Sequence, residues 1–444
     1  MSKEKDEKRL ETQSYKGVRD FYPEDQAVQN YIFDIWREAS QKFGYVEYGA
    51  SILEPAELYR AKTGEEIVNE QTYTFTDRGG REVTLRPEMT PTVARMIAAK
   101  RRELSFPLRW FSIPNLFRYE SPQRGRLREH WQLNADLFGV PTIDAEVEII
   151  SLARDIMLRF FEASPDASDA KFVIRINSRK VMNYILLDWL KLSDESARKI
   201  SKLIDRKAKM SREEFDEKLT ALAGEHNQTL LTLLNSQNVE EFISHLPETA
   251  RAHEGILEIK DLLKRLSRLG ITNTIFDQTL MRGFDYYTGI VFEVFDTNPE
   301  NKRSLFGGGR YDDLLSIFGK EKIPAVGFGM GDVTIRDVLE TYNLLPKNRT
   351  TIDLYICHTD TDHITQALLL AENLRKQGLK ISVDLSRKKI GDQIRSATRH
   401  NATHIVVVGD EEVRSGVYRL KNIESSGKEQ RVGEAEIYSA IRKS

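Results

Sequence analysis

The segment Phe117–Gly139, FRYESPQRGRLREHWQLNADLFG, gathers side chains that handle charge and hydrogen bonds. Its first half places arginines and glutamates around a loop that contains the turn residues proline and glycine. If WQLNADLF is a strand, Gln132, Asn134 and Asp136 share one face, because successive side chains point to opposite faces. Burying such groups without a partner costs about 1–3 kcal/mol each. The segment therefore predicts a strand that lines a site for a polar ligand.

The alternative is an ordinary hairpin with a solvated outer face, because antiparallel sheets often expose one side to water. Two features weigh against it. Gln, Asn and Asp have weak strand propensity on an exposed face. A second stretch, Met281–Asp296, adds an arginine, an aspartate and two tyrosines to an otherwise apolar strand. Two strands with such groups predict one shared cavity with hydrogen-bonding walls.

Hydrophobic periodicity indicates the elements that must position these strands. Apolar residues recur at three- and four-residue spacing over about Asp25–Phe43 and Asp144–Phe161, which predicts two amphipathic helices. Strand-like pieces with hairpin spacing and no crossover helices predict a mainly antiparallel sheet. Residues 180–269 are nearly free of glycine and helical throughout, so they predict an all-helical insertion. We interpret the charge of this insertion as solvated helix surface; nucleic-acid binding by its lysines is the alternative.

The chain after a proline-containing break at Tyr342–Asn348 alternates strands and helices, which predicts a small α/β domain with a largely parallel sheet. The expected fold is thus an α+β domain on a mainly antiparallel sheet flanked by helices. It carries an all-helical insertion and is followed by the small α/β C-terminal domain. Two or three domains agree with the length of 444 residues.

Composition limits the class of protein. The formal net charge is −2, so any nucleic-acid contact depends on local basic patches. The charged N-terminus has no apolar signal segment and no apolar run could span a membrane, so we expect a cytoplasmic protein without membrane contact. The single cysteine, Cys357, lies in an apolar run and is expected in a core. Clustered Cys/His spacing is absent, so we expect no metal site made by protein ligands alone.

Five motifs in register resemble histidyl-tRNA synthetases, a family of class II aminoacyl-tRNA synthetases. In chain order they are GVRDFYPED, TLRPEMTPTVARM, the Phe117–Gly139 segment, LMRGFDYYTG, and GGGRYDDL with IPAVGFGMG. The third matches motif 2 of class II enzymes, and RGxDYYTG matches a segment specific to the histidine enzymes. The resemblance spans nearly the whole chain from about Gly17. It implies a catalytic domain (17–335), which contains the predicted insertion (180–269), and an anticodon-binding domain (351–444). The residues themselves predict a mobile tail (1–16) and a linker (336–350).

The resemblance implies a two-step reaction. ATP and L-histidine form histidyl-adenylate, and the histidyl group then passes to the 3′ end of tRNA(His). Mg²⁺ is expected to arrive with ATP, because the phosphates need a counter-charge. A homodimer is also implied. In the C-terminal domain, the basic stretches Arg387–Lys389 and Arg395–His400 are candidates for contact with the tRNA, although charge runs of this kind are usually solvated surface.

The implied catalytic residues are Arg118 and Arg282, placed on opposite sides of the α-phosphate; arginine suits this task through its permanent charge and planar donor fork. A structural salt bridge is the alternative for Arg282. Glu120 matches the residue near the adenine amino group, and Arg126 matches a residue that meets the ATP phosphates. The glycine-rich strands imply close backbone approach to ATP at Gly329 and Gly331. The loop residues expected near the tRNA acceptor end are Gln123, Arg124 and Arg128.

Histidine recognition needs acceptors for an ammonium group and an imidazole N–H. The residues that match the histidine site of the family, besides Arg118 and Arg282, are Glu88, Met89, Thr90, Gln132, Asp136, Tyr286 and Tyr287. Taken without the resemblance, two adjacent tyrosines in a strand would more often belong to a core. A pocket of hydrogen-bonding groups can discriminate strongly among amino acids.

Two positions depart from the class II pattern. Thr334 stands where motif 3 usually has an arginine that clamps ATP, and Arg336, two residues later on a helix, is expected to point elsewhere. Ser51 stands where motif 1 usually has proline. Two alternatives to the enzyme follow: a non-catalytic relative, the synthetase-like regulatory subunit of ATP phosphoribosyltransferase, or a synthetase-derived RNA-binding module.

Overall fold

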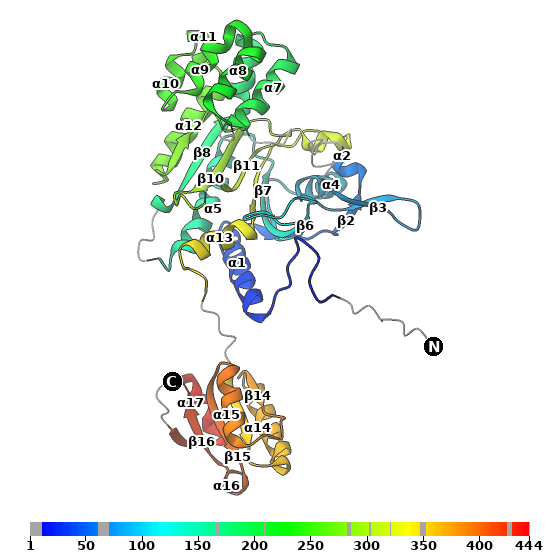
Figure 1. The fold of residues 1–444 in the computed structure, drawn as a ribbon, viewed down its shortest axis with the longest axis vertical. Coiled ribbons are helices and arrows are strands. Elements are labelled where there is room, and N and C mark those ends of the chain that lie inside the picture. Colours follow the sequence, from blue (N-terminus) through cyan, green and yellow to red (C-terminus); the bar gives the residue numbers. More distant parts are fainter. Residues whose placement is uncertain are drawn as a thin grey trace, which may run out of the picture. The chain divides into compact units, whose positions relative to one another are not determined.

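The computed structural model of the chain describes residues 11–60, 71–164, 169–207, 210–281, 286–301, 303–319, 321–346, 352–423 and 429–443. The chain divides into two compact units (Figure 1). The first comprises the chain up to Pro346 apart from Phe21–Val28; the second comprises that short segment and the chain after Pro346. None of the helices formed by the described residues is both long enough and apolar enough to cross a membrane.

The first unit is built on a nine-stranded sheet with the order β1-β5-β7-β12-β11-β10-β8-β9, in which β6 also pairs with β7. Only β1–β5 and β8–β9 pair in parallel, so the prediction of a mainly antiparallel sheet is confirmed. The strands are β1 (Val46–Glu47), β5 (Leu108–Ser112), β6 (Asn115–Phe117), β7 (Glu129–Phe138), β8 (Phe172–Ser178), β9 (Thr274–Phe276), β10 (Ile290–Asp296), β11 (Ser304–Arg310) and β12 (Ala325–Gly331).

Helices cover both faces of this sheet. Helices α1 (Pro23–Lys42), α5 (Asp144–Phe161) and α13 (Asp332–Thr341) pack on one face, where Trp36 Nε1 lies 3.0 Å from Met330 Sδ. Helix α4 (Thr90–Lys100) packs on the other face, where Val93 and Ile97 share a core with Phe138. Beside α4 lies a three-stranded sheet with the order β2-β4-β3 (Figure 1). Its strands, with the short helix α2, are β2 (Leu53–Pro55), α2 (Glu57–Arg60), β3 (Tyr73–Thr76) and β4 (Glu82–Leu85).

The polar face of β7 is buried. Asn134 and Asp136 are only 5% and 4% exposed, and Leu133, Ala135 and Leu137 on the opposite face are buried against α5 and α13. The alternative of a hairpin with a solvated outer face is therefore wrong. A strand covered on both faces needs a specific use for its polar side chains.

The predicted insertion is all helical and forms one group of helices (Figure 1). Its core is apolar, with Ile200, Leu219 and Ile259 buried, while Lys199 and Lys218 pair with glutamates one turn earlier on their own helices. The elements are α6 (Arg179–Asn183), a π-helical turn (Tyr184–Trp189), α7 (Asp194–Asp205), α8 (Arg212–Ala223), α9 (Asn227–Leu234), α10 (Val239–Ser244), α11 (Glu248–Arg251) and α12 (Glu254–Arg268).

One predicted boundary needs correction. The linker expected at 336–350 begins later, because α13 continues to Thr341 and buries Val338 and Leu339 against the sheet. The tail expected at 1–16 lies outside the described residues up to position 10. Beyond it, the hydroxyl of Tyr15 accepts a hydrogen bond of 3.0 Å from Arg128, which ties this end of the segment to the residue just before β7.

The second unit is a small α/β fold with the strand order β14-β13-β15-β16-β17. β13 pairs in parallel with β14 and β15, and the last two pairings are antiparallel. Cys357 is fully buried in β13, as expected, and burial raises its pKa to about 12. The elements are β13 (Ile352–His358), α14 (Ile364–Lys376), β14 (Ile381–Val383), α15 (Ile390–Arg399), β15 (Ala402–Val408), α16 (Asp410–Ser415), β16 (Val417–Asn422), β17 (Glu429–Gly433) and α17 (Glu434–Lys443).

Candidate active site

The hairpin of β6 and β7 presents Arg118 at its loop end. β6 pairs with β7 in antiparallel register, with Phe117 opposite Glu129, and Arg118 follows at once. Its Nε donates a hydrogen bond of 2.8 Å to the carbonyl oxygen of Pro87, the residue before Glu88. Among the described residues, its two terminal nitrogens have no recorded protein partner. Arg118 is thus anchored through Nε, and its two terminal nitrogens remain available for a ligand.

Glu88 connects this arginine to the predicted tyrosines. The hydroxyl of Tyr286 donates a 3.2 Å hydrogen bond to Oε2 of Glu88, and the hydroxyl of Tyr59 lies 3.3 Å from the Glu88 carbonyl oxygen. The rings of Tyr286 and Tyr287 lie 5.0 Å apart. Burial, followed by the charge of Glu88, raises the pKa of Tyr286 well above its ordinary value, so its hydroxyl remains a donor. Met89 is buried at the start of α4, next to Thr90.

The two tyrosines do not lie within the strand that their sequence suggests. β10 begins only at Ile290, and Tyr286–Gly289 forms an irregular segment before it. The nitrogen of Thr288 donates to the Arg310 carbonyl oxygen at 2.8 Å, and a Cβ on Gly289 would lie 3.0 Å from the Arg310 side chain. This segment therefore lies against Arg310, the last residue of β11.

Asp136 is a buried carboxyl group in the same neighbourhood. The hydroxyl of Tyr311 donates to its Oδ1, and the rings of Tyr311 and Tyr286 lie 5.8 Å apart. Burial raises the pKa of Asp136 from 3.8 to about 7, although the bond from Tyr311 opposes the shift. Consecutive contacts thus join Arg118, Glu88, Tyr286, Tyr311 and Asp136.

The glycines of β12 make room for side chains of β7. Gly327 pairs with Asp136, and a Cβ on Gly327 would stand 2.0 Å from Asp136 Oδ1. A Cβ on Gly329 would meet Gln132 at 2.8 Å. Glycine is therefore required here so that Asp136 and Gln132 can lie flat on β12. Close approach of Gly329 and Gly331 to ATP remains a prediction.

The loop between β6 and β7 lies on α13. Its tip, Gly125, has a φ of +74°, and a Cβ there would lie 3.6 Å from Thr334 Cγ2. Arg124 donates to Asn301 and to Thr341 at 3.1 and 3.0 Å. Thr334, which replaces the usual arginine, therefore lies beneath this loop and donates its hydroxyl to the Leu305 carbonyl oxygen. Arg336 pairs with Glu340 at 3.0 Å, as expected for a side chain that points elsewhere.

The charged residues of the loop pair with one another and with neighbouring segments. Arg126 contacts Glu120 at 2.8 Å and is about half exposed, and Gln123 accepts a 2.7 Å bond from Arg303. Arg128 is only 9% exposed, because its guanidinium lies 4.0 Å from the ring centroid of Tyr119 and bonds to Tyr15. In this conformation Arg126 offers an exposed charge, whereas Arg128 is covered by the two tyrosines. The roles predicted for these residues toward ATP and tRNA remain predictions.

His130 also lies on the site face of β7, although sequence reasoning missed it. It shares the even-numbered face with Gln132 and Asp136, which was the available signal. Burial, with smaller effects from the charges of Arg118 and Arg19, lowers its pKa to about 3. A neutral imidazole therefore stands beside Arg118. Arg19 in turn bonds to the buried Asp332 at 2.6 Å.

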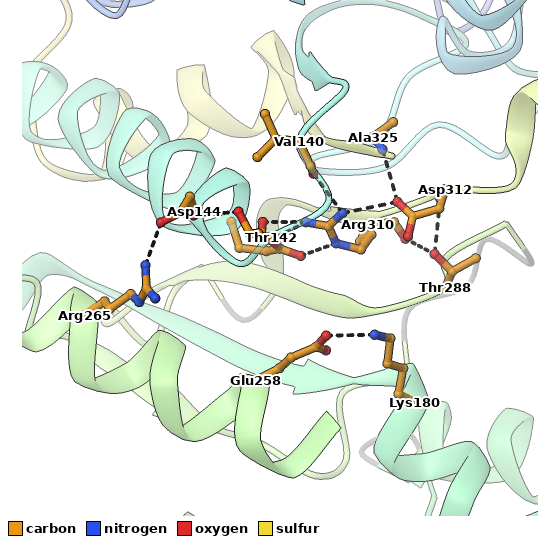
Figure 2. A network of polar contacts seen from close by, with 11 residues as sticks. Val140, Thr142, Asp144, Lys180, Glu258, Arg265, Thr288, Arg310, Asp312 and Ala325 are labelled. Atoms are coloured by element: carbon orange, nitrogen blue, oxygen red, sulfur yellow. Dashed lines mark hydrogen bonds and ion pairs between the residues drawn. The ribbon is translucent and has the colours of Figure 1, made fainter. Parts of the chain in front are cut away.

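Arg310, the arginine of GGGR, has a structural task. Its guanidinium forms two 2.6 Å bonds to the carboxylate of Glu146 in α5 and also reaches the carbonyl oxygens of Val140 and Thr142 (Figure 2). Figure 2 shows the same guanidinium next to Asp312, at 3.3 Å. This buried pair fixes the end of β11 against α5, and no sequence signal distinguished it from a phosphate ligand.

Arg282, the second predicted catalytic arginine, lies outside the described residues. Among the predicted residues that the structure describes, the contacts above link Arg118, Glu88, Asp136, Tyr286 and Tyr287. Met89 and Thr90 follow Glu88 in the chain, and Gln132 lies on the same face of β7 as Asp136, against Gly329. Within the described part of the chain, no three His, Cys, Asp or Glu side chains gather as metal ligands.

Comparison with known proteins now identifies the family. The family model for histidyl-tRNA synthetase matches residues 17–333, and a model for an anticodon binding domain matches residues 347–444. A histidine–tRNA ligase of Leptospira biflexa is 42% identical over 425 residues, which is 94% of this chain and 95% of that protein.

Solved structures share the fold. A histidyl-tRNA synthetase from Nostoc aligns with a TM-score of 0.80 at 22% identity, over 98% of this chain and 100% of that chain. A structure from Bacillus halodurans, described as an ATP phosphoribosyltransferase regulatory subunit/histidyl-tRNA synthetase, aligns with a TM-score of 0.72 at 25% identity, over 90% of this chain and 99% of that chain. With matches over nearly its whole length, the chain belongs to the histidyl-tRNA synthetase family.

Proposed function

We propose that this protein is a histidine–tRNA ligase, which activates L-histidine with ATP and transfers it to the 3′ end of tRNA(His). The observation that carries the proposal is the continuous set of contacts from Arg118 through Glu88 and Tyr286 to Tyr311 and Asp136. At one end of this set lies the Arg118 guanidinium with available donors, which a phosphate requires. At the other end lie buried acceptors, which the N–H groups of an amino acid require.

Activation is a phosphoryl-type displacement in which the histidine carboxylate attacks the α-phosphate and pyrophosphate leaves. The protein needs mainly to align the two anions and to stabilise the negative charge that develops on the α-phosphate. Arg118 takes this role, because its guanidinium is anchored through Nε and its terminal nitrogens remain available. We assign the opposite side of the phosphate to Arg282, as its place in RGxDYYTG implies. Arg126 and Glu120 would serve the phosphates and the adenine.

Histidine would bind between Glu88, Gln132 and Asp136, with the rings of Tyr286 and Tyr287 as walls. Asp136 is 4% exposed and its Oδ2 has no recorded partner within the described part of the chain, so an unsatisfied acceptor there is costly and a ligand with an N–H donor relieves that cost. An amino acid without such a donor would leave this oxygen unpaired. The site would therefore reject it strongly without a separate editing step.

Further parts of the proposal go beyond the site itself. Mg²⁺ accompanies the ATP phosphates and supplies their counter-charge. The protein acts in the cytoplasm, as part of translation. It forms a homodimer; the exposed apolar residues Val46 and Leu53, on either side of Ser51, support this assignment. Gln123, Arg124 and Arg128 are assigned to the loop that meets the tRNA acceptor end, and the C-terminal unit to the anticodon.

The regulatory subunit of ATP phosphoribosyltransferase is the second candidate, because the Bacillus halodurans structure carries both names. Two observations favour the ligase. The region at 347–444 matches an anticodon-binding model, and Arg118, Glu88 and Asp136 are all present, linked through Pro87, Tyr286 and Tyr311. A regulatory subunit needs neither a phosphate-aligning arginine nor a domain for tRNA.

Amino-acid-dependent exchange between ATP and pyrophosphate tests the proposal. The purified protein is incubated with ATP, Mg²⁺, labelled pyrophosphate and each of the twenty amino acids in turn. We expect exchange with histidine only, and subsequent charging of tRNA(His). Exchange with no amino acid would favour the regulatory or RNA-binding alternatives, and exchange with a different amino acid would overturn the histidine assignment.

A further inference from the structure

Tyr311 is a buried residue that links three parts of the site. It directly follows β11, its nitrogen donates to the Ala325 carbonyl oxygen at 2.8 Å, and its side chain is 2% exposed. Its ring packs edge-on against Phe138 at 6.2 Å and against Tyr286 at 5.8 Å. A ring held on two sides has one orientation, so its hydroxyl has one direction.

The hydroxyl of Tyr311 donates to Oδ1 of Asp136. This is the one hydrogen bond that the described part of the chain gives this carboxyl group, and Oδ2 has no recorded protein partner there. The absent side chain of Gly327 lets the carboxyl group lie against β12. Asp136 thus has one oxygen anchored by the protein and one oxygen left over.

The residues on either side of Tyr311 fix its backbone. Arg310 forms the buried pair with Glu146 in α5, and the Asp312 carboxylate accepts a bond of 3.1 Å from the Ala325 nitrogen (Figure 2). The nitrogen of Asp312 donates to the hydroxyl of Thr288 at 3.2 Å, which joins it to the segment of Tyr286 and Tyr287. Three consecutive residues therefore hold α5, β7, β12 and the tyrosine segment in one arrangement.

The phenols around Asp136 stay protonated near pH 7. Burial raises the pKa of Tyr45 and Tyr48, from the segment around β1, well above the ordinary value, and the charge of Asp136 adds to the shift of both. Tyr311 and Tyr286 are raised in the same way, with contributions from Asp136 and Glu88 respectively. Arg86 acts on Tyr48 and is held by three backbone carbonyl oxygens. Among these groups, Tyr311 alone donates a hydrogen bond to Asp136.

We propose that Tyr311 is a positioning residue for histidine recognition: by occupying Oδ1 of Asp136, it holds the carboxylate so that Oδ2 accepts an N–H of the substrate. Tyr311 does not touch the substrate in this arrangement. The inference rests on the proposed function, because it takes Asp136 as a histidine-binding residue.

Tyr311→Phe tests this role, because it removes the hydroxyl and keeps the ring. In histidine-dependent exchange, we expect KM for histidine to rise roughly 10- to 100-fold, the range for losing a hydrogen bond to a charged group, with KM for ATP unchanged. Because the Tyr311 bond lowers the pKa of Asp136, its loss should move the acid limb of kcat/KM for histidine to higher pH. If Tyr311 only supported the fold, its loss would not shift the acid limb for histidine while KM for ATP stayed unchanged.

Tyr45→Phe is the matched control. Tyr45 is also buried, but its hydroxyl contacts Glu148 at 3.1 Å and not Asp136, so KM for histidine and the acid limb should stay unchanged. A double-mutant cycle adds a second readout: in an Asp136→Ala background, which removes both carboxyl oxygens, Tyr311→Phe should have little further effect on KM for histidine.

Different results would overturn the proposed function and the role of Tyr311. Absence of exchange by the unaltered protein would overturn the proposed function and, with it, the inference. Normal exchange together with an unchanged KM and pH profile in Tyr311→Phe would overturn the inference alone, as would full additivity in the cycle. If Tyr311→Phe fails to fold, incorporation of a fluorinated tyrosine at 311 keeps the shape and strengthens the donor. The acid limb should then move to lower pH, and an unmoved limb would contradict the inference.

Discussion

Asp136 carries its carboxyl group in a buried position with a pKa of about 7, against an ordinary 3.8. Between about pH 4 and pH 7 the folded protein keeps a proton that the unfolded chain releases. The stability contributed by this group is therefore complete below about pH 4 and is lost as the pH rises through 7. The difference of about three pKa units corresponds to about 4 kcal/mol at most.

Asp136→Asn removes this titration and keeps an oxygen that can accept the Tyr311 hydrogen bond. We expect the ligand-free variant to gain stability relative to the unaltered protein as the pH rises from 4.5 to 8, measured by urea-induced unfolding. Asp155→Asn is the control, because it also removes an aspartate carboxyl group but breaks only a surface pair with Arg159. Equal pH dependence for Asp136→Asn and the unaltered protein would contradict the burial of a proton-binding carboxyl group.

Sequence reasoning reached the residues of β7 because side chains alternate along a strand, so Gln132, Asn134 and Asp136 could be placed on one face. It could not reach Tyr311. The bond between Tyr311 and Asp136 crosses 175 positions and depends on the sheet order β7-β12-β11, which no local pattern encodes. Motif resemblance assigned roles, but it did not reveal which side chains hold the functional ones in place.

At the scale of elements, α5 carries two glutamates with different surroundings. Glu146 is 1% exposed and forms a two-bond pair with Arg310, whereas Glu148 is partly exposed and pairs with Arg109 at 2.7 Å. Removing one partner of a buried pair leaves an uncompensated charge and costs about 3–5 kcal/mol. A pair nearer the surface contributes about 1 kcal/mol or less.

Glu146→Gln should therefore lower the thermal midpoint of the first unit by several degrees more than Glu148→Gln does. It should also raise KM for histidine, because Arg310 holds the segment before β10 through Thr288. Thermal unfolding followed by circular dichroism, with exchange kinetics on the same samples, measures both effects. Equal midpoints for the two variants would show that the Arg310 pair does not anchor this part of the sheet.

The elements were largely predictable, since the period of apolar residues placed α5 at Asp144–Phe161 and the insertion near 180–269. Two boundaries were not. α13 continues into the expected linker, because Val338 and Leu339 are buried by sheet contacts that are remote in sequence. The strand expected through Tyr286 starts only at Ile290, and the segment before it is hydrogen-bonded to Arg310, which is remote in sequence.

At the scale of the whole molecule, the account separates adenylate chemistry in the first unit from tRNA recognition in the second. Lys388 and Lys389 are exposed after the carboxyl end of β14, the edge where ligands of parallel sheets usually bind. Lys376 and Lys380 are exposed at the opposite end of the same strand. The two pairs carry equal charge and form a matched comparison.

The double variant Lys388→Ala/Lys389→Ala should raise KM for tRNA(His) about 10-fold and weaken its salt dependence, because two phosphate contacts are lost. Histidine-dependent exchange should stay unchanged. Lys376→Ala/Lys380→Ala should leave both activities near normal. Aminoacylation measured at two salt concentrations compares the two double variants. Equal effects of both would show that this edge of the sheet does not contact the tRNA.

The central claim is that two guanidinium groups meet at one phosphorus beside a site for an imidazole. A crystal structure with a non-hydrolysable analogue of histidyl-adenylate tests it most directly. We predict Arg118 and Arg282 within hydrogen-bond distance of the α-phosphate from opposite sides, and the imidazole within reach of Asp136 Oδ2. A bound analogue with Arg282 remote from the phosphate, or with its imidazole away from Asp136, would contradict the account.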